Sequence, residues 1–130
     1  MTDHGVPIEV QTAATLATVE RFNAAFNNHD VAAVMAEMTE DCVFENTYPP
    51  PDGERSVGRE TVRGVWVNFF RSSPHARFQT EDIFAAGDRC VVRWIYRWVD
   101  DAGKPGHVRG VDVFRVRAGK VAEKLSYVKG

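Results

Sequence analysis

The chain has 130 residues, of which 44% are hydrophobic and 26% charged, and its formal net charge at pH 7 is -2. This length fits one domain with one core, and the composition is too apolar for an intrinsically disordered chain. Because charges of both signs are scattered without a basic stretch, nucleic acid and membrane lipid are excluded as expected partners.

The first residues carry no recognisable targeting signal. Residues 1–5 contain no basic region followed by an apolar run, and no later stretch is apolar enough to cross a bilayer. We therefore expect residues 1–9 to be a flexible lead-in, residues 10–130 to form a single domain, and the protein to be cytoplasmic.

Hydrophobic periodicity predicts three helices in the first part of the chain. The first follows the lead-in and has one apolar face, formed by Leu16, Val19, Phe22 and Phe26. The second is short, begins after the N-cap residue Asp30, and buries Val31, Val34, Met35 and Met38. The third covers about residues 59–71, and its apolar face consists of Val62, Val65, Trp66, Phe69 and Phe70.

Strand patterns fill the remainder of the sequence. A short strand is predicted at residues 42–46, and the prolines of the loop 48–53 must end it because they cannot donate to a strand ladder. Four more strands are predicted at about 75–85, 89–99, 107–117 and 121–129. The short loops between these four make them antiparallel neighbours, so helices first and strands afterwards predict an α+β fold.

The two faces of the predicted sheet differ in character. One phase of residues 89–99 is an apolar row suited to face the helices: Cys90, Val92, Trp94, Tyr96 and Trp98. We expect Trp98 to be buried, so that its replacement by Ala costs about 3–5 kcal/mol. The opposite phase mixes arginines with apolar residues, namely Val91, Ile95, Val99, Val111 and Val113. These are too many for a solvated face, so a second sheet is expected to cover them in a homodimer.

Asp112 breaks the apolar pattern. It lies between Gly110 and Phe114 on the phase of residues 107–117 that otherwise points into the interior. A buried carboxylate must be paired, hydrogen-bonded or kept protonated, and such groups are enriched at functional sites. Two interpretations stay open: a structural ion pair with Arg109 or another arginine, or an acid or base that acts on a ligand.

Metal ligands and cofactor motifs are not indicated. Cys42 and Cys90 stand alone and are interpreted as small core residues. The histidines are widely spaced, at His4, His29, His75 and His107. A metal would need several such ligands to converge, so no metal is expected.

Three runs of the sequence resemble the nuclear transport factor 2-like superfamily, particularly its SnoaL-like bacterial members. They are residues 19–30 (VERFNAAFNNHD), 57–62 (VGRETV) and 110–121 (GVDVFRVRAGKV). The resemblance covers nearly the whole chain. It implies a cone-like α+β fold, in which about three N-terminal helices pack on a curved, mainly antiparallel sheet and enclose a pocket.

The catalytic sets of two enzymes in that superfamily are incomplete here. Ketosteroid isomerase uses an aspartate base, a tyrosine donor and a protonated aspartate donor. The last of these corresponds to Asp112, but the base position is Asn46 and the tyrosine position is Phe22, and neither residue can do that chemistry. In the residue set of limonene epoxide hydrolase, the asparagine corresponds to Asn46. The tyrosine position is Phe44 and the aspartate positions are Ile95 and Ser126, so this set is also incomplete.

The resemblance and the pattern together predict a protein that binds a small, mostly apolar carbonyl or hydroxyl compound. The activity implied is that of an isomerase, cyclase or lyase without a cofactor, centred on Asp112, with Glu123 as a second candidate acid. The predicted ligand-binding residues are Asn46, Tyr48, Phe22, Trp66, Tyr96, Trp98 and Phe114. The alternative is a non-catalytic small-molecule-binding or dimerisation module, which the missing family bases favour.

Overall fold

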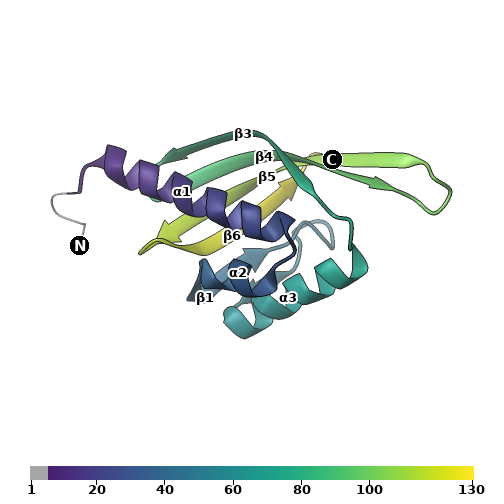
Figure 1. Cartoon of the computed structure of the whole chain (residues 1–130), viewed down its shortest axis with the longest axis horizontal. Helices are drawn as coiled ribbons and strands as arrows, with labels where there is room; N and C mark the ends of the chain where they lie inside the picture. The colour runs from purple at the N-terminus through teal and green to yellow at the C-terminus, as the bar shows by residue number, and fades with distance from the viewer. Residues whose placement is uncertain (1–5) are drawn as a thin grey trace.

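The computed structural model of the chain describes residues 6–130, so His4 and residues 1–5 of the predicted lead-in lie outside the described part. In chain order its elements are α1 (Ile8–Asn27), α2 (Val31–Ala36), β1 (Met38–Glu45), β2 (Arg55–Val57), α3 (Arg59–Ser72), β3 (Phe78–Ala86), β4 (Arg89–Val99), β5 (Pro105–Arg117) and β6 (Lys120–Val128). The strands form one sheet in the order β2-β1-β6-β5-β4-β3. Helix α1 runs across β3 to β6, and α3 lies beside β1 (Figure 1). The predicted fold class, three helices on a mainly antiparallel sheet, is confirmed.

The helices begin and end close to the predicted positions. Helix α1 starts at Ile8, so the end of the predicted lead-in is already helical. Asp30 caps α2 as predicted, because its side chain accepts a hydrogen bond of 3.0 Å from the backbone nitrogen of Ala33. Helix α2 ends at Ala36, before Met38, which is buried from a strand rather than from the helix.

Strand β1 differs most from the prediction. It begins at Met38 instead of Cys42, and it pairs in parallel with β6. Its other neighbour is the three-residue strand β2, which the sequence analysis missed. Three residues are too few for an alternating pattern, and local sequence carries no signal for the pairing of two strands from opposite ends of the chain.

Residues 57–62, one of the three runs that carry the family resemblance, form the connection between β2 and α3. Gly58 has a φ of 91°, a left-handed conformation that favours glycine, and it precedes the first turn of α3. The next residue, Arg59, donates hydrogen bonds of 2.8 and 2.9 Å to the backbone oxygens of Met35 and Met38. This run therefore ties α3 to the junction of α2 and β1.

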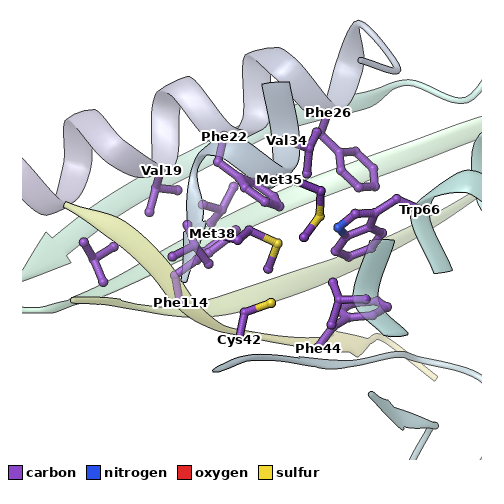
Figure 2. Close-up of a cluster of buried hydrophobic side chains, with 14 of the residues drawn as sticks. Val19, Phe22, Phe26, Val34, Met35, Met38, Cys42, Phe44, Trp66 and Phe114 are labelled. Atoms are coloured by element: carbon purple, nitrogen blue, oxygen red, sulfur yellow. The ribbon is translucent and has the colours of Figure 1, made fainter. Parts of the chain in front are cut away.

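A hydrophobic core rich in aromatic residues lies between the helices and the sheet (Figure 2). Phe22 is fully buried, and its ring meets those of Trp66 and Phe114 edge to face, with centroids 6.4 and 5.6 Å apart. Cys42 and Cys90 are buried in the core, as predicted. Burial raises the pKa of the Cys42 thiol and raises the pKa of Cys90 to about 11, so neither thiol is a reactive nucleophile.

The apolar row of β4 faces the helices as predicted, except at its end. Cys90, Val92 and Trp94 are buried. Trp98, in contrast, is 43% exposed, so the prediction of its burial is wrong. The reason is that the hairpin of β4 and β5 extends past the helices (Figure 1). Trp98 therefore lies over its cross-strand partner Gly106 rather than over a helix.

A second cross-strand pair, Trp94 and Gly110, leads to a prediction about packing. A Cβ atom at Gly110 would lie 2.5 Å from Cζ2 of Trp94 and would also clash with the backbone oxygen of Tyr127. Gly110→Ala is therefore expected to lower the free energy of unfolding by about 1–3 kcal/mol, as measured by urea denaturation. The matched control is Gly64→Ala in α3, where a Cβ meets nothing within 4 Å and should stabilise the helix by about 0.5–1 kcal/mol. A neutral result for Gly110→Ala would contradict the packing of Trp94 on this glycine.

Candidate functional site

A cavity of about 190 Å³ lies between the helices and the inner face of the sheet. Its lining includes seven aromatic side chains, Phe26, Phe44, Trp66, Phe69, Phe78, Trp94 and Tyr96. The lining residues Thr80 and Val128 are exposed and therefore mark the side that opens to solvent. The cavity is thus apolar over most of its wall, as small-molecule sites generally are.

Asp112, Ser126 and Lys124 form what we call the polar corner of this cavity. Ser126 Oγ donates a hydrogen bond of 2.6 Å to Asp112 Oδ1, and Lys124 Nζ lies 3.3 Å from Asp112 Oδ2. Lys124 Nζ also donates to Ser126 Oγ over 3.1 Å. Asp112 is 6% exposed and Lys124 8%, so both charges are buried and compensate each other.

This pairing differs from the ion pair that the sequence analysis considered. The cation beside Asp112 is a lysine of β6 and not an arginine. Arg109 lies on the opposite phase of β5 and pairs with Glu81, with Nε 3.1 Å from Oε1.

Aromatic rings surround the Lys124 ammonium in addition to its polar partners. Nζ lies 4.8 Å from the ring centroid of Phe44 and 5.6 Å from those of Phe26 and Trp66. A cation within about 6 Å of a ring centroid is attracted by the ring quadrupole. The polar corner therefore favours a positive charge at this point through one carboxylate and three rings.

The register of β5 and β6 explains how the polar corner is assembled. Asp112 pairs with Ser126, and Phe114 pairs with Lys124. Because side chains alternate between the two faces of a strand, Lys124 and Ser126 share the inner face with Asp112. Glu123 lies on the outer face, 3.7 Å from Arg115, so the hypothesis that it supplies an acid to the pocket is wrong.

The predicted ligand-binding residues are distributed over three places. Three of them line the cavity: Asn46, Trp66 and Tyr96. Two lie in the aromatic core and are fully buried: Phe22 and Phe114. The other two are exposed and lie outside the cavity lining: Tyr48, which the loop after β1 carries outwards, and Trp98.

Several polar groups of the cavity wall are already engaged by the chain itself. The Asn27 amide exchanges two hydrogen bonds of 2.9 Å with the backbone of Phe78, and Asn46 Oδ1 accepts one of 2.7 Å from the backbone nitrogen of Thr47. The indole nitrogens of Trp66 and Trp94 are buried and have no hydrogen-bond partner within residues 6–130. That of Trp66 is on the side of the ring facing Met35 (Figure 2). Buried donors are rarely unpaired, so both indole nitrogens are exceptions within the packed wall.

Lys124 and Ser126 are the residues of the polar corner that the sequence analysis did not assign to the site. Alternation in residues 120–128 does not reveal them, because their phase is more polar than the phase that contains Val121, Leu125 and Tyr127. Lysines are rarely buried, so a lysine near the end of a strand is expected to point to solvent.

Neither a cluster of metal ligands nor a membrane-spanning helix is found in the described part of the chain. Within residues 6–130, no group of three or more His, Cys, Asp and Glu side chains is close enough to hold a metal ion. No helix in that range is long and apolar enough to cross a membrane.

Comparison with known proteins identifies related sequences and structures. The model of the SnoaL-like domain family matches residues 19–124. An NTF2-like protein of unknown function from Mesorhizobium loti is 40% identical, with 92% of this chain and 94% of that chain covered and a TM-score of 0.79. No curated protein matches the chain.

Two more distant structures have the same fold. A candidate polyketide cyclase from Pseudomonas putida is 23% identical, with 88% of this chain and 91% of that chain covered and a TM-score of 0.69. A candidate ketosteroid isomerase from Kribbella flavida is 19% identical, with 92% and 81% covered and a TM-score of 0.74. At these identities the likeness concerns the fold, which supports many different activities.

Proposed function

This chain belongs to the SnoaL-like domain family, and we propose that it binds a single-ring, mostly apolar compound that carries a carbonyl or hydroxyl oxygen. The observation that carries the proposal is the cavity, whose wall is aromatic except at the polar corner. An apolar ring would lie against the wall, and its oxygen would accept a hydrogen bond from Lys124.

The size of the cavity sets the size of the ligand. A cavity of about 150 Å³ in another protein holds benzene. The volume here is about 190 Å³, which suits one substituted ring and not a fused four-ring steroid. The proposed ligand class is therefore smaller than a steroid, in agreement with the incomplete ketosteroid isomerase residues at Asn46 and Phe22.

We propose isomerase, cyclase or lyase chemistry centred on Asp112. All three reactions can begin with removal of a proton from the carbon next to a carbonyl group, for which a carboxylate is a suitable base. The Lys124 ammonium, next to Asp112, would stabilise the negative charge that develops on the carbonyl oxygen. Ser126 would hold the carboxylate in place through its hydrogen bond to Oδ1.

A non-catalytic binding module is the second candidate. The observation that favours it is that both oxygens of Asp112 already have partners, Ser126 Oγ and Lys124 Nζ. In that case the polar corner recognises a ligand oxygen without transferring a proton. Turnover of a bound ketone, followed as exchange of its α-hydrogens with deuterated water, distinguishes the two candidates.

Thermal denaturation with a panel of ligands tests the binding proposal. Cyclohexanone and phenol should raise the melting temperature, because a ligand that binds only the native state at 100 times its Kd stabilises it by about 2.7 kcal/mol. A steroid ketone is the size control and should have no effect. If neither small compound shifts the melting temperature at saturating concentration, the binding proposal is wrong.

We also propose that the outer face of the sheet forms a homodimer. Four cross-strand neighbours make a continuous apolar row across β3 to β6: Phe84, Val91, Val113 and Leu125. Phe84 is 55% exposed, and ion pairs such as that of Arg115 with Glu123 flank the row. Sedimentation equilibrium should give twice the monomer mass, and Phe84→Glu should shift the protein to monomers. A wild-type protein that stays monomeric at high concentration would exclude this arrangement.

A further inference from the structure

Lys124 is unusual among the lysines of this chain. The others, Lys104, Lys120 and Lys129, are exposed. Lys124 is 8% exposed and lines the cavity. Its ammonium compensates the buried Asp112 carboxylate, with Nζ 3.3 Å from Oδ2, and it is the lysine that lies within reach of a ligand in the cavity. A buried primary amine in a ligand cavity has a recognised chemical use, which is nucleophilic attack on a carbonyl group.

We propose that the Lys124 amine forms a covalent iminium with the carbonyl carbon of a small aldehyde or ketone bound in the cavity. The inference rests on the carbonyl ligand class proposed above. It does not depend on Asp112 acting as the base for turnover, and it adds a covalent step that the proposed function does not contain.

The polar corner supplies the proton transfers that the reaction needs. Transfer of one proton from the Lys124 ammonium to the Asp112 carboxylate gives a neutral amine and a neutral acid, with no change in net charge. The nitrogen lone pair attacks the carbonyl carbon while the Asp112 acid protonates the carbonyl oxygen. The nitrogen then passes one proton to the Asp112 carboxylate, Asp112 gives this proton to the hydroxyl group, and the hydroxyl group leaves as water, so that one C=N bond replaces the C=O bond.

The charges of reactant and product balance in this scheme. Ammonium, carboxylate and carbonyl compound are converted to iminium, carboxylate and one water molecule. The product keeps a single positive charge on the same nitrogen, opposite Asp112 Oδ2, which lies 3.3 Å from Nζ. The rings of Phe44, Phe26 and Trp66 surround this nitrogen at 4.8 to 5.6 Å and favour the iminium as they favour the ammonium.

The cavity also holds the reacting groups close together. An aromatic aldehyde has the size of the single-ring ligand proposed above, and its ring would pack against the aromatic wall. Because Lys124 lines the cavity, a carbonyl group bound there meets its amine at a high effective concentration. The exposed lysines lack this advantage, so the inference predicts modification selective for Lys124.

Reductive trapping of the native protein tests the inference. The wild-type protein is treated with benzaldehyde and sodium cyanoborohydride, which reduces an iminium to a stable secondary amine, and the modified lysine is located by peptide mass spectrometry. We expect a benzyl adduct on Lys124 and loss of that adduct when phenol, which cannot form an iminium, occupies the cavity. The Lys124→Arg variant keeps the charge and should lose the adduct.

The outcomes separate this inference from the proposed function. An adduct on Lys124 that phenol suppresses supports the inference. A rise in melting temperature with benzaldehyde but no adduct on Lys124 overturns the inference and leaves the binding proposal intact. Adducts only on Lys104, Lys120 or Lys129, or an adduct on Lys124 that phenol does not reduce, also overturn it. Because the decisive measurement uses the wild-type chain, it does not depend on the folding of any variant.

Discussion

Lys124→Met is expected to lower the free energy of unfolding by about 3–5 kcal/mol, because it leaves a buried carboxylate without its cation. Asp112 is 6% exposed, and its two partners are Lys124 and Ser126. After the substitution, only the Ser126 hydroxyl would compensate the charge. Urea denaturation near neutral pH measures this loss directly.

Two further variants test whether this loss of stability comes from the unpaired charge of Asp112. Lys129→Met changes an exposed lysine and should alter the free energy of unfolding by less than about 0.5 kcal/mol. The double variant Lys124→Met with Asp112→Leu should recover most of the loss, because replacing a whole buried ion pair with apolar residues is often neutral or stabilising. A double variant no more stable than Lys124→Met alone would rule out the electrostatic explanation.

Trp66→Ala should also cost about 3–5 kcal/mol, since it removes a large buried side chain from a packed core. Trp66 is 2% exposed, and its ring lies 4.5 Å from that of Phe44 and 5.1 Å from that of Phe26 between centroids. The substitution also removes one of the rings around the Lys124 ammonium, so it should weaken ligand binding in the thermal assay.

Trp98→Ala is the matched control for this substitution. Trp98 is 43% exposed and lies beyond the helices, so its loss should cost only about 1 kcal/mol. Equal costs for the two tryptophans would show that the end of β4 is buried in solution, and would contradict the arrangement described here.

Local sequence predicted the helices and the antiparallel strands well, and long-range pairing poorly. The spacing of Val19, Phe22 and Phe26 was enough to identify the buried face of α1, because a helix repeats every 3.6 residues. The parallel pairing of β1 with β6 was missed, since it joins strands that are distant in the chain. The burial of Trp98 was predicted wrongly. Alternation of apolar and polar residues identifies which face of a strand is buried, but it does not show where along the strand the covering helices end.

The candidate site was predictable only in part for a similar reason. Asp112 stood out because a carboxylate interrupted an apolar phase. Its partners Lys124 and Ser126 come from the neighbouring strand, and they could be assigned only once the register of β5 and β6 was known. The composition of a cavity depends on which strands are adjacent, and a single sequence does not specify this directly.

An NMR titration of the ¹⁵N-labelled protein with cyclohexanone tests most directly whether the cavity is the ligand site. The chain has 3 tryptophans, so three indole N–H signals are expected. Trp66 and Trp94 line the cavity and Trp98 does not. We expect the signals of Trp66 and Trp94 to shift with added ketone while that of Trp98 stays in place. No shift at saturating ketone, or a shift of the Trp98 signal alone, would contradict the assignment of this cavity as the binding site.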